Sequence, residues 1–264
     1  MKEAIHVKKE NGILNFEDFG GYESRNTSVI ELIKLTDEKY NLPDFKTIFI
    51  STGDKYVKKN DMKALAFSNY NTTQNIIPDF VFFHWNEAKI YDYEKYVIDI
   101  FNIGFEQPQT NKIGWVGCVD MSPKRKTLIN LSRQYANKIE AISMNWRTLT
   151  NYTSLFDQIK KWKYLVDIEG IGYSGRLKIL LFSQRCIFVV DRVWKDITFK
   201  YIKPWEHYVP VNSDLSNLIE MYDYIQKNPE IEQKIIKNAS EMAKKYLTRE
   251  NALAVMREAL LNNL

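Results

Sequence analysis

Cysteine and histidine are scarce in this chain of 264 residues. The two cysteines, Cys118 and Cys186, form no C-x-x-C pair and have no histidine nearby in the sequence. This pattern argues against a structural zinc site and against a framework of disulfide bonds. The three histidines, His6, His84 and His207, have no neighbouring Ser, Cys or Asp in the arrangement of a catalytic triad.

Long hydrophobic runs are also absent. No stretch reaches the roughly 18 apolar residues of a membrane span. The opening residues "MKEAIHVKKENG" lack the apolar core of a signal peptide, and the final "ALLNNL" is not a retention tail for the endoplasmic reticulum. We therefore expect a cytoplasmic protein without a membrane span.

The charge of the chain is mild, with a formal net charge of +4. Lysines alternate with apolar residues and form no continuous basic tract, as on solvated helix faces, so we expect no nucleic-acid partner. A small anionic substrate such as a nucleotide is compatible with this balance. Aromatic residues make up 14% of the chain, which fits either a rigid core or stacking platforms for sugars and bases.

Predicted strands alternate with predicted helices, which favours an α/β fold with mostly parallel sheets. The predicted strands cover residues 45–52, 63–69, 79–85, 112–119, 163–169 and 186–191. The predicted helices cover residues 28–39, 91–102, 122–137, 214–228 and 229–264. The polar segment 104–111 reads as a linker, so we expect two domains, 1–108 and 109–264, with a ligand cleft between them.

A glycine-rich turn follows the predicted strand 163–169. In "VDIEGIGYSGRLKILL" (166–181), Gly170, Gly172 and Gly175 have G-x-G-x-x-G spacing, and Asp191 follows the next strand. Alone this indicates a dinucleotide site, or only a tight strand–helix turn. The turn lies two-thirds of the way along the chain, and Arg176 follows it directly. Both features favour a diphosphate ligand other than a nicotinamide dinucleotide, bound by Arg176 and the amino end of the next helix.

Other candidate residues lie at the ends of predicted strands. Asp167 and Glu169 form a D-x-E pair that could chelate Mn²⁺ or Mg²⁺, although no metal is needed if Arg176 and a helix N-terminus neutralise the diphosphate. Ser122 is a candidate N-cap, with Pro123 at the first helical position. Asp54 lies just after a predicted strand and is preceded by Gly53. This position is typical of a general base that projects into a cleft and also of a turn residue.

The run "YLVDIEGIGYSGRLKILLFSQRCIFVVDRVWKDITFKYIKPWEHYVPVNSDLSNLIE" resembles glycosyltransferase family 90, the protein O-glucosyltransferase and capsule-associated family. The block "KPWEHYVPV" (203–211) carries much of that resemblance, which is firm over residues 160–230. Upstream, "WVGCVDMSPKR" is similar to the family's diphosphate segment, which assigns Ser122 and Arg125 to that role. It departs from the family at Val116 and Val119, where polar or basic residues are common.

The resemblance implies a GT-B-like fold with two Rossmann-like domains, the first on the acceptor side and the second binding the nucleotide sugar. It implies a UDP-glucose or UDP-xylose donor, a saccharide or glycan acceptor, inversion at the anomeric carbon, and no metal or other cofactor. In "FKTIFISTGDKYV" the catalytic base maps to Asp54. The expected residues for departing UDP are Ser122, Arg125, Arg176 and the turn Gly170, Gly172, Tyr173, Ser174 and Gly175.

Asp191 has two interpretations, a ligand of the donor's ribose or sugar hydroxyls and a cap of the turn before Trp194. Three other functions stay open at this point. They are a metal-dependent glycosyltransferase that uses Asp167 and Glu169, a nicotinamide-dependent oxidoreductase, and a sugar-binding module without catalysis.

Overall fold

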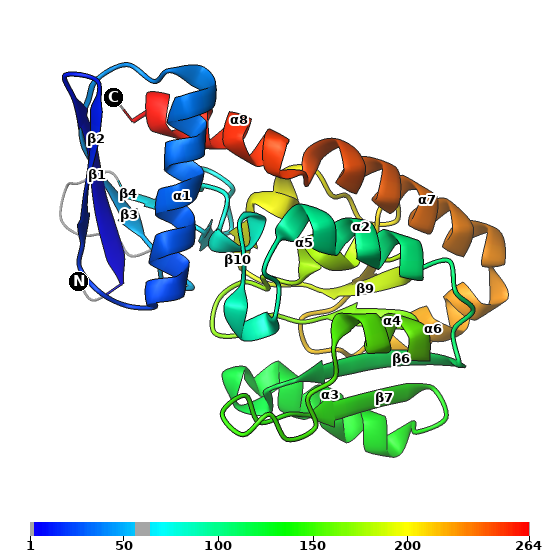
Figure 1. Ribbon diagram of the computed structural model, residues 1–264. Helices are drawn as coiled ribbons and strands as arrows, with labels where there is room; N and C mark the ends of the chain where they lie inside the picture. Colours follow the sequence, from blue (N-terminus) through cyan, green and yellow to red (C-terminus); the bar gives the residue numbers. More distant parts are fainter. Residues whose placement is uncertain (1–2, 56–63, 264) are drawn as a thin grey trace. The chain divides into compact units, whose positions relative to one another are not determined.

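The computed structural model describes residues 3–55 and 64–263, and its chain divides into two compact units (Figure 1). Unit 1 comprises Met1–Tyr96, Val193–Lys200 and Lys245–Leu264, and unit 2 comprises Val97–Arg192 and Tyr201–Lys244. This division differs from the expected one at 108/109. The chain returns to unit 1 twice, because residues 193–200 and 245–264 pack with elements of the first 96 residues. Local composition gives no signal of such long-range pairing.

Unit 1 contains a four-stranded sheet of mixed direction. Its strands are β1 (Ala4–Glu10), β2 (Ile13–Asp18), β3 (Phe45–Ser51) and β4 (Ala64–Ala66), in the order β2-β1-β3-β4. Strand β1 is antiparallel to both neighbours, and only β3 and β4 run parallel. The α/β class is confirmed, whereas the sheet of this unit is mixed rather than mostly parallel.

The β1–β2 hairpin did not figure in the sequence-based prediction. Asn11 and Gly12 connect its strands with left-handed φ values of 52° and 76°, the backbone that Asn-Gly turns favour. The Asp44 carboxylate accepts hydrogen bonds from both backbone N–H groups, at 2.8 and 2.9 Å. An Asn-Gly pair between two β-prone runs was therefore the signal for this hairpin.

The rest of unit 1 is helical or forms short ladders. Helix α1 (Glu23–Tyr40) packs against α8 (Arg249–Leu261), and β5 (Ser68–Tyr70) pairs with β10 (Trp194–Asp196). The strand predicted at 79–85 is wrong. Phe80–Phe82 form a 3₁₀ turn, η1, in which the Asp79 side chain accepts a hydrogen bond from the Val81 N–H. An apolar run of this length is ambiguous between strand and helix.

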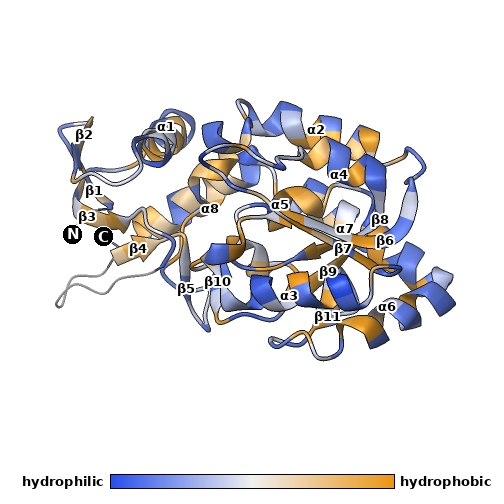
Figure 2. Cartoon of the chain, turned by 90° about the horizontal axis from the view of Figure 1, so that it is seen from below, coloured by the Kyte–Doolittle hydropathy of each residue, from blue (hydrophilic) through white to orange (hydrophobic). Residues whose placement is uncertain are grey.

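Unit 2 contains a five-stranded parallel sheet. Its strands are β6 (Thr110–Gly117), β7 (Ile139–Ser143), β8 (Trp162–Asp167), β9 (Cys186–Val190) and β11 (Val209–Val211), in the order β11-β9-β8-β6-β7. Its helices are α2 (Tyr93–Ile103), α3 (Pro123–Gln134), α4 (Leu155–Lys161), α5 (Leu177–Leu180), α6 (Leu218–Lys227) and α7 (Pro229–Tyr246), of which α2 and α7 extend past the unit boundary. Figure 2 shows apolar residues along the central strands of unit 2 and both apolar and polar residues along its helices.

The core of unit 2 explains this layering. Alternate strand side chains, among them Trp115, Tyr164 and Phe188, pack with apolar residues of α3, α6 and α7. Because crossovers between parallel strands are right-handed, α3 and α4 cover opposite faces of the sheet. The strand order reverses between β6 and β8, and the carboxyl ends of the strands at such a switch point are where ligands bind in α/β folds. Among the described residues, none of the helices has the length and apolar character to cross a membrane.

Candidate functional site

The segments that follow β6, β8 and β9 lie at one edge of the unit 2 sheet, because parallel strands end on the same side. We call this the carboxyl edge, comprising residues 118–125, 168–176 and 191–192. It contains the predicted residues Ser122, Arg125, Gly170 and Arg176, with Asp191 at the end of β9. The sheet therefore gathers most of the predicted site at its switch point.

Arg176 joins the two strands of the switch point. Its guanidinium donates to the Val116 carbonyl of β6 and to the Val166 carbonyl of β8, both at 3.0 Å. Its Nε lies 3.4 Å from Asp167 Oδ1, and 15% of the side chain is exposed. Burial lowers the pKa of Arg176, and the attraction of Asp167 opposes that change. This predicted ligand of UDP thus also holds the strand ends together.

Arg125 makes a second set of bonds to main-chain carbonyls from the first turn of α3. It donates to the carbonyls of Glu169 at 2.9 Å, Cys118 at 2.8 Å and Ile168 at 3.4 Å. Burial and then the neighbouring Arg176 lower the pKa of Arg125 to about 10, so the guanidinium stays charged at neutral pH. Two arginines therefore span the carboxyl ends of β6 and β8.

Asp167 is completely buried at the end of β8. One carboxylate oxygen accepts from the Ser174 hydroxyl and the other from Arg192, each at 2.6 Å. Burial by itself raises the pKa of Asp167, but Arg192, Arg176 and the Ser174 hydroxyl together hold it below its usual value. Asp167 is thus an internal counter-charge, and Arg192 is a residue of the site that sequence patterns did not reveal.

Glu169 and Asp191 are linked through Lys124, the residue before Arg125. The Lys124 ammonium lies 2.5 Å from a carboxylate oxygen of Glu169 and donates to the Asp191 carbonyl at 2.8 Å. The second Glu169 oxygen lies 4.0 Å from Arg192 Nε. Both members of the predicted D-x-E pair therefore face cationic side chains.

The glycine-rich turn differs from its prediction in one respect. The helix that follows it, α5, has only four residues, so little helix dipole is available there. None of Gly170, Gly172 and Gly175 has a positive φ. A Cβ on Gly170 would stand 3.5 Å from an Arg125 nitrogen, which is ordinary van der Waals contact. Tyr173 and Ser174 are nearly buried.

Helix α3 offers a longer helix start at the same edge. Ser122 is its N-cap and Pro123 its first residue, as predicted. Ser122 is 7% exposed, and within the described chain its hydroxyl makes no hydrogen bond that caps α3. A cap hydroxyl, a helix amino terminus and Arg125 together form an arrangement suited to an anion.

A pocket of about 470 Å³ opens between the carboxyl ends of β6 and β7. Cys118, Asp120 and Met121 line it on the side of α3, and Trp146 and Arg147 line it beyond β7. Trp146 is 53% exposed, and the Arg147 guanidinium lies 5.3 Å from the centre of its ring. Trp146 lies in none of the predicted motifs. The high aromatic content of the chain was the only sequence signal for an exposed aromatic ring on which a base or sugar could stack.

Asp54 lies in unit 1, just after β3. Its carboxylate forms an ion pair with Arg25 of α1 at 2.8 Å, and its carbonyl accepts from the Ser68 hydroxyl at 2.9 Å. The side chain is 29% exposed, which leaves it accessible. The Arg25 guanidinium also lies 4.7 Å from the Phe80 ring centre. Arg25 was not singled out from the sequence, because nothing local links it to a carboxylate 29 residues later.

A parallel sheet whose strand order reverses between β6 and β8 defines an α/β protein of the class that binds its ligands at the carboxyl ends of the strands. The family is then clear. This chain belongs to glycosyl transferase family 90, whose model matches residues 21–263. Within the described residues, no group of three or more His, Cys, Asp or Glu is placed to hold a metal ion.

Several curated proteins are similar to the chain. Protein O-glucosyltransferase 1 of Homo sapiens is 29% identical over 141 residues, covering 49% of this chain and 36% of that protein. Protein O-glucosyltransferase 2 of Danio rerio is 25% identical over 236 residues, covering 82% of this chain and 46% of that protein. The chain thus matches less than half the length of either relative. A glycosyltransferase from Rickettsia africae ESF-5 superimposes with a TM-score of 0.45 at 10% identity, covering 93% of this chain and 85% of that structure.

Proposed function

We propose that this protein transfers glucose or xylose from a UDP-sugar to a hydroxyl of a glycan acceptor, with inversion and without a metal ion. Membership of glycosyl transferase family 90 supports the reaction type. The human and zebrafish relatives are named protein O-glucosyltransferases, which favours glucose over xylose.

The observation that carries the proposal is the pair of arginines at the switch point of unit 2. Arg125 and Arg176 span β6 and β8, and Ser122 is the N-cap residue of α3 beside them. In this proposal the diphosphate of UDP binds the Ser122 hydroxyl and the backbone N–H groups at the start of α3. It also accepts hydrogen bonds from those N–H groups of Arg125 and Arg176 that do not bond carbonyls. Guanidinium forks match phosphate oxygens in geometry and charge. The diphosphate lies against the turn that contains Gly170, Gly172 and Gly175, which have no side chains to exclude it. Tyr173 and Ser174 of the same turn pack below the ligand.

The pocket beside Trp146 suits the nucleoside end of the same ligand. Its wall shares Cys118 and Met121 with the loop that Arg125 contacts, so base and diphosphate sites adjoin in this proposal. A flat base stacks on an exposed aromatic ring with a contribution of about 1–3 kcal/mol. Asp191, which Lys124 ties to the same edge, is then the candidate for a ribose or sugar hydroxyl.

Metal independence is supported by the partners of the acidic pair. A divalent cation bound by Asp167 and Glu169 would have to displace Arg192 and Lys124 from their carboxylates. With those cations in place, the negative charge that develops on UDP is met by Arg125 and Arg176 instead.

Asp54 is the proposed general base. Its carboxylate takes the proton of the acceptor hydroxyl while the hydroxyl oxygen bonds to the anomeric carbon. The bond from that carbon to the diphosphate oxygen breaks, and UDP leaves with the electron pair. The ion pair with Arg25 positions the carboxylate for this step. Attack opposite to the leaving group inverts the anomeric centre.

Calorimetric titration with UDP and measurement of UDP release from UDP-glucose and UDP-xylose in EDTA test this proposal. We expect UDP binding, turnover in EDTA, and an Asp54→Asn variant that binds UDP normally but loses turnover by at least about 10²-fold. Asp92→Asn is the matched control, because Asp92 forms another Asp–Arg ion pair in unit 1, with Arg249 at 3.0 Å.

The outcomes separate the alternatives. Activity that is lost in EDTA and restored by Mn²⁺ indicates the metal-dependent reaction. Stabilisation by nicotinamide cofactors but not by UDP indicates an oxidoreductase. UDP binding without turnover, unchanged by Asp54→Asn, indicates a binding module.

A further inference from the structure

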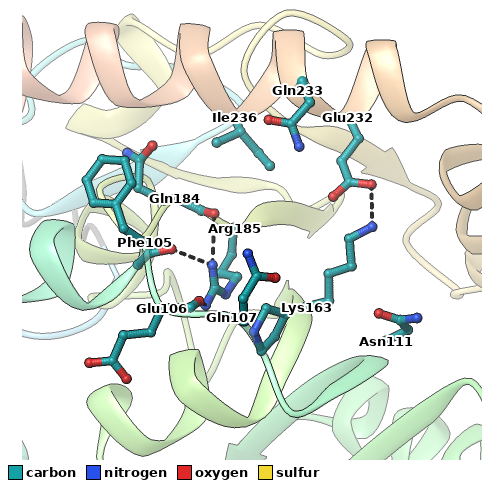
Figure 3. Close-up of a pocket in the computed structure, with 12 residues that line it drawn as sticks. Phe105, Glu106, Gln107, Asn111, Lys163, Gln184, Arg185, Glu232, Gln233 and Ile236 are labelled. Atoms are coloured by element: carbon teal, nitrogen blue, oxygen red, sulfur yellow. Dashed lines mark hydrogen bonds and ion pairs between the residues drawn. The ribbon is translucent and has the colours of Figure 1, made fainter.

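A second cavity, of about 400 Å³, opens at the opposite edge of the unit 2 sheet, where β6, β8 and β9 begin. We call this the amino edge. Residues 104–108 and Asn111 form one wall, Lys163, Gln184 and Arg185 form the strand side, and α7 covers the remainder (Figure 3). The volume is within the range of about 300–1,000 Å³ that small-ligand sites occupy. No residue of the carboxyl edge lines it.

The cavity wall is fixed by Arg185, whose side chain is nearly buried. Its guanidinium donates to the carbonyls of Gly104 at 2.5 Å, Glu106 at 2.6 Å and Ile159 at 3.1 Å. A Cβ on Gly104 would stand 2.1 Å from the Ser183 carbonyl oxygen, so only glycine fits there. The segment that the sequence predicted as a linker is therefore held to unit 2 by Arg185 and forms one wall of the cavity.

The charges that line the cavity balance. Lys163 pairs with the buried Glu232 of α7 at 2.9 Å, and Figure 3 shows its side chain extended toward that carboxylate. Glu106 lies 3.7 Å from Lys160, and Arg185 is occupied by carbonyls. The lining cations Lys163 and Arg185 are thus matched by Glu106 and Glu232. This balance does not favour an anionic ligand.

Amide side chains supply the remaining polar groups. Gln107, Asn111 and Gln233 line the cavity, and within the part of the chain that the structure describes their amides make no hydrogen bond. Figure 3 shows Gln233 descending from α7 and Gln107 lying below it, on either side of the same space. Each amide can donate and accept, as each hydroxyl of a sugar can.

Phe105 adds an exposed aromatic surface, with 65% of the residue accessible. Its ring meets Phe101 edge to face, with centres 5.0 Å apart, which orients it. Phe101 is in turn covered by the Lys244 ammonium, 3.5 Å from its ring centre. A fixed ring beside uncommitted amides offers a flat apolar surface next to hydrogen-bonding groups.

We propose that the amino edge of unit 2 is a binding site for a neutral saccharide. The apolar C–H face of a sugar ring packs on Phe105, while its hydroxyls exchange hydrogen bonds with the amides of Gln107, Asn111 and Gln233. This site is separate from the carboxyl edge, and the inference does not depend on which donor the protein uses there.

Calorimetric titration of the full chain with cellobiose, maltose and xylobiose, in the absence of UDP, tests the site. We expect millimolar binding of at least one of them. Phe105→Ala should weaken it by at least about tenfold, and Gln233→Ala by about threefold to tenfold. Phe105→Tyr keeps the ring and should retain the affinity. Tyr91→Ala is the matched control, because Tyr91 is a similarly exposed aromatic residue of unit 1.

Several results would overturn the inference. These are the absence of binding by all three disaccharides, binding that Phe105→Ala leaves unchanged, or tighter binding of inorganic phosphate at this edge. Melting temperatures of the variants verify that each is folded. UDP titration of Phe105→Ala should give the wild-type affinity, so failure at the amino edge can be told apart from failure of the proposed UDP site.

Discussion

The two edges of the unit 2 sheet use arginine in the same way and yet differ in character. Arg176 and Arg125 bond carbonyls at the carboxyl ends of β6 and β8, and Arg185 bonds carbonyls where β6 and β9 begin. The difference lies in their neighbours, which are the N-cap residue Ser122 and the start of α3 at one edge and the amides of Gln107, Asn111 and Gln233 at the other. An arginine at a strand end is therefore no sign of an anion site by itself, because the groups beside it decide what can bind.

The largest effect should come from breaking the internal charge pair of the carboxyl edge. Asp167→Asn leaves Arg192, whose side chain is 1% exposed, without its buried counter-charge. We expect a loss of about 3–5 kcal/mol in the free energy of unfolding, measured by urea denaturation. A loss below about 1 kcal/mol would show that the pair contributes little to the fold.

The same pair gives a pH dependence with a definite sign, which completes this prediction. The pKa of Asp167 is lower in the folded protein than its unfolded value of about 3.9. Its contribution is therefore present above pH 4 and is lost as the pH falls through the lower folded pKa. The difference in stability between wild type and Asp167→Asn should shrink on acidification, and an increase would contradict the assignment.

A smaller effect should separate the two edges directly. Arg176→Lys and Arg185→Lys each remove bonds to strand-end or loop carbonyls, so both should lower stability by about 1–3 kcal/mol. Only Arg176→Lys should also weaken UDP binding, by about tenfold, because lysine lacks the planar fork. Equal UDP affinities in the two variants would remove the distinction between the edges.

The smallest effect is the response to salt. Raising ionic strength from about 0.05 to 0.5 M shortens the screening length severalfold, so UDP affinity should fall by about threefold to tenfold. Disaccharide affinity at the charge-balanced amino edge should change by less than twofold. Calorimetry with each ligand at both salt concentrations makes the comparison.

Local sequence signals predicted what depends on neighbours along the chain. The strands β3, β6, β8 and β9 and the start of α3 at Ser122 follow from apolar periodicity and capping chemistry, and the strand order then brings Arg125 and Arg176 together. The family resemblance supplied the reason to look at those residues.

What the sequence did not disclose depends on distant partners. Arg192 is identified only by its ion pair with Asp167, and Arg25 only by its ion pair with Asp54. Trp146 is identified only by the pocket that it lines beyond β7. The run "LKILLF" predicted a longer helix than α5, because apolar residues buried on all sides carry no period that marks where the helix ends.

The three separate segments of unit 1 have a consequence for biosynthesis. The ion pair between Lys39 of α1 and Glu250 of α8 joins residues 211 positions apart. Contacts of such long range form slowly and require the distant segment to be present. During synthesis on the ribosome, strands β6 to β9 of unit 2 emerge and can pair before α8 has been made, when α1 still lacks its packing partner. A truncation anywhere before Arg249 would leave α1 without its packing partner, so unit 1 should complete its folding only after synthesis has passed α8.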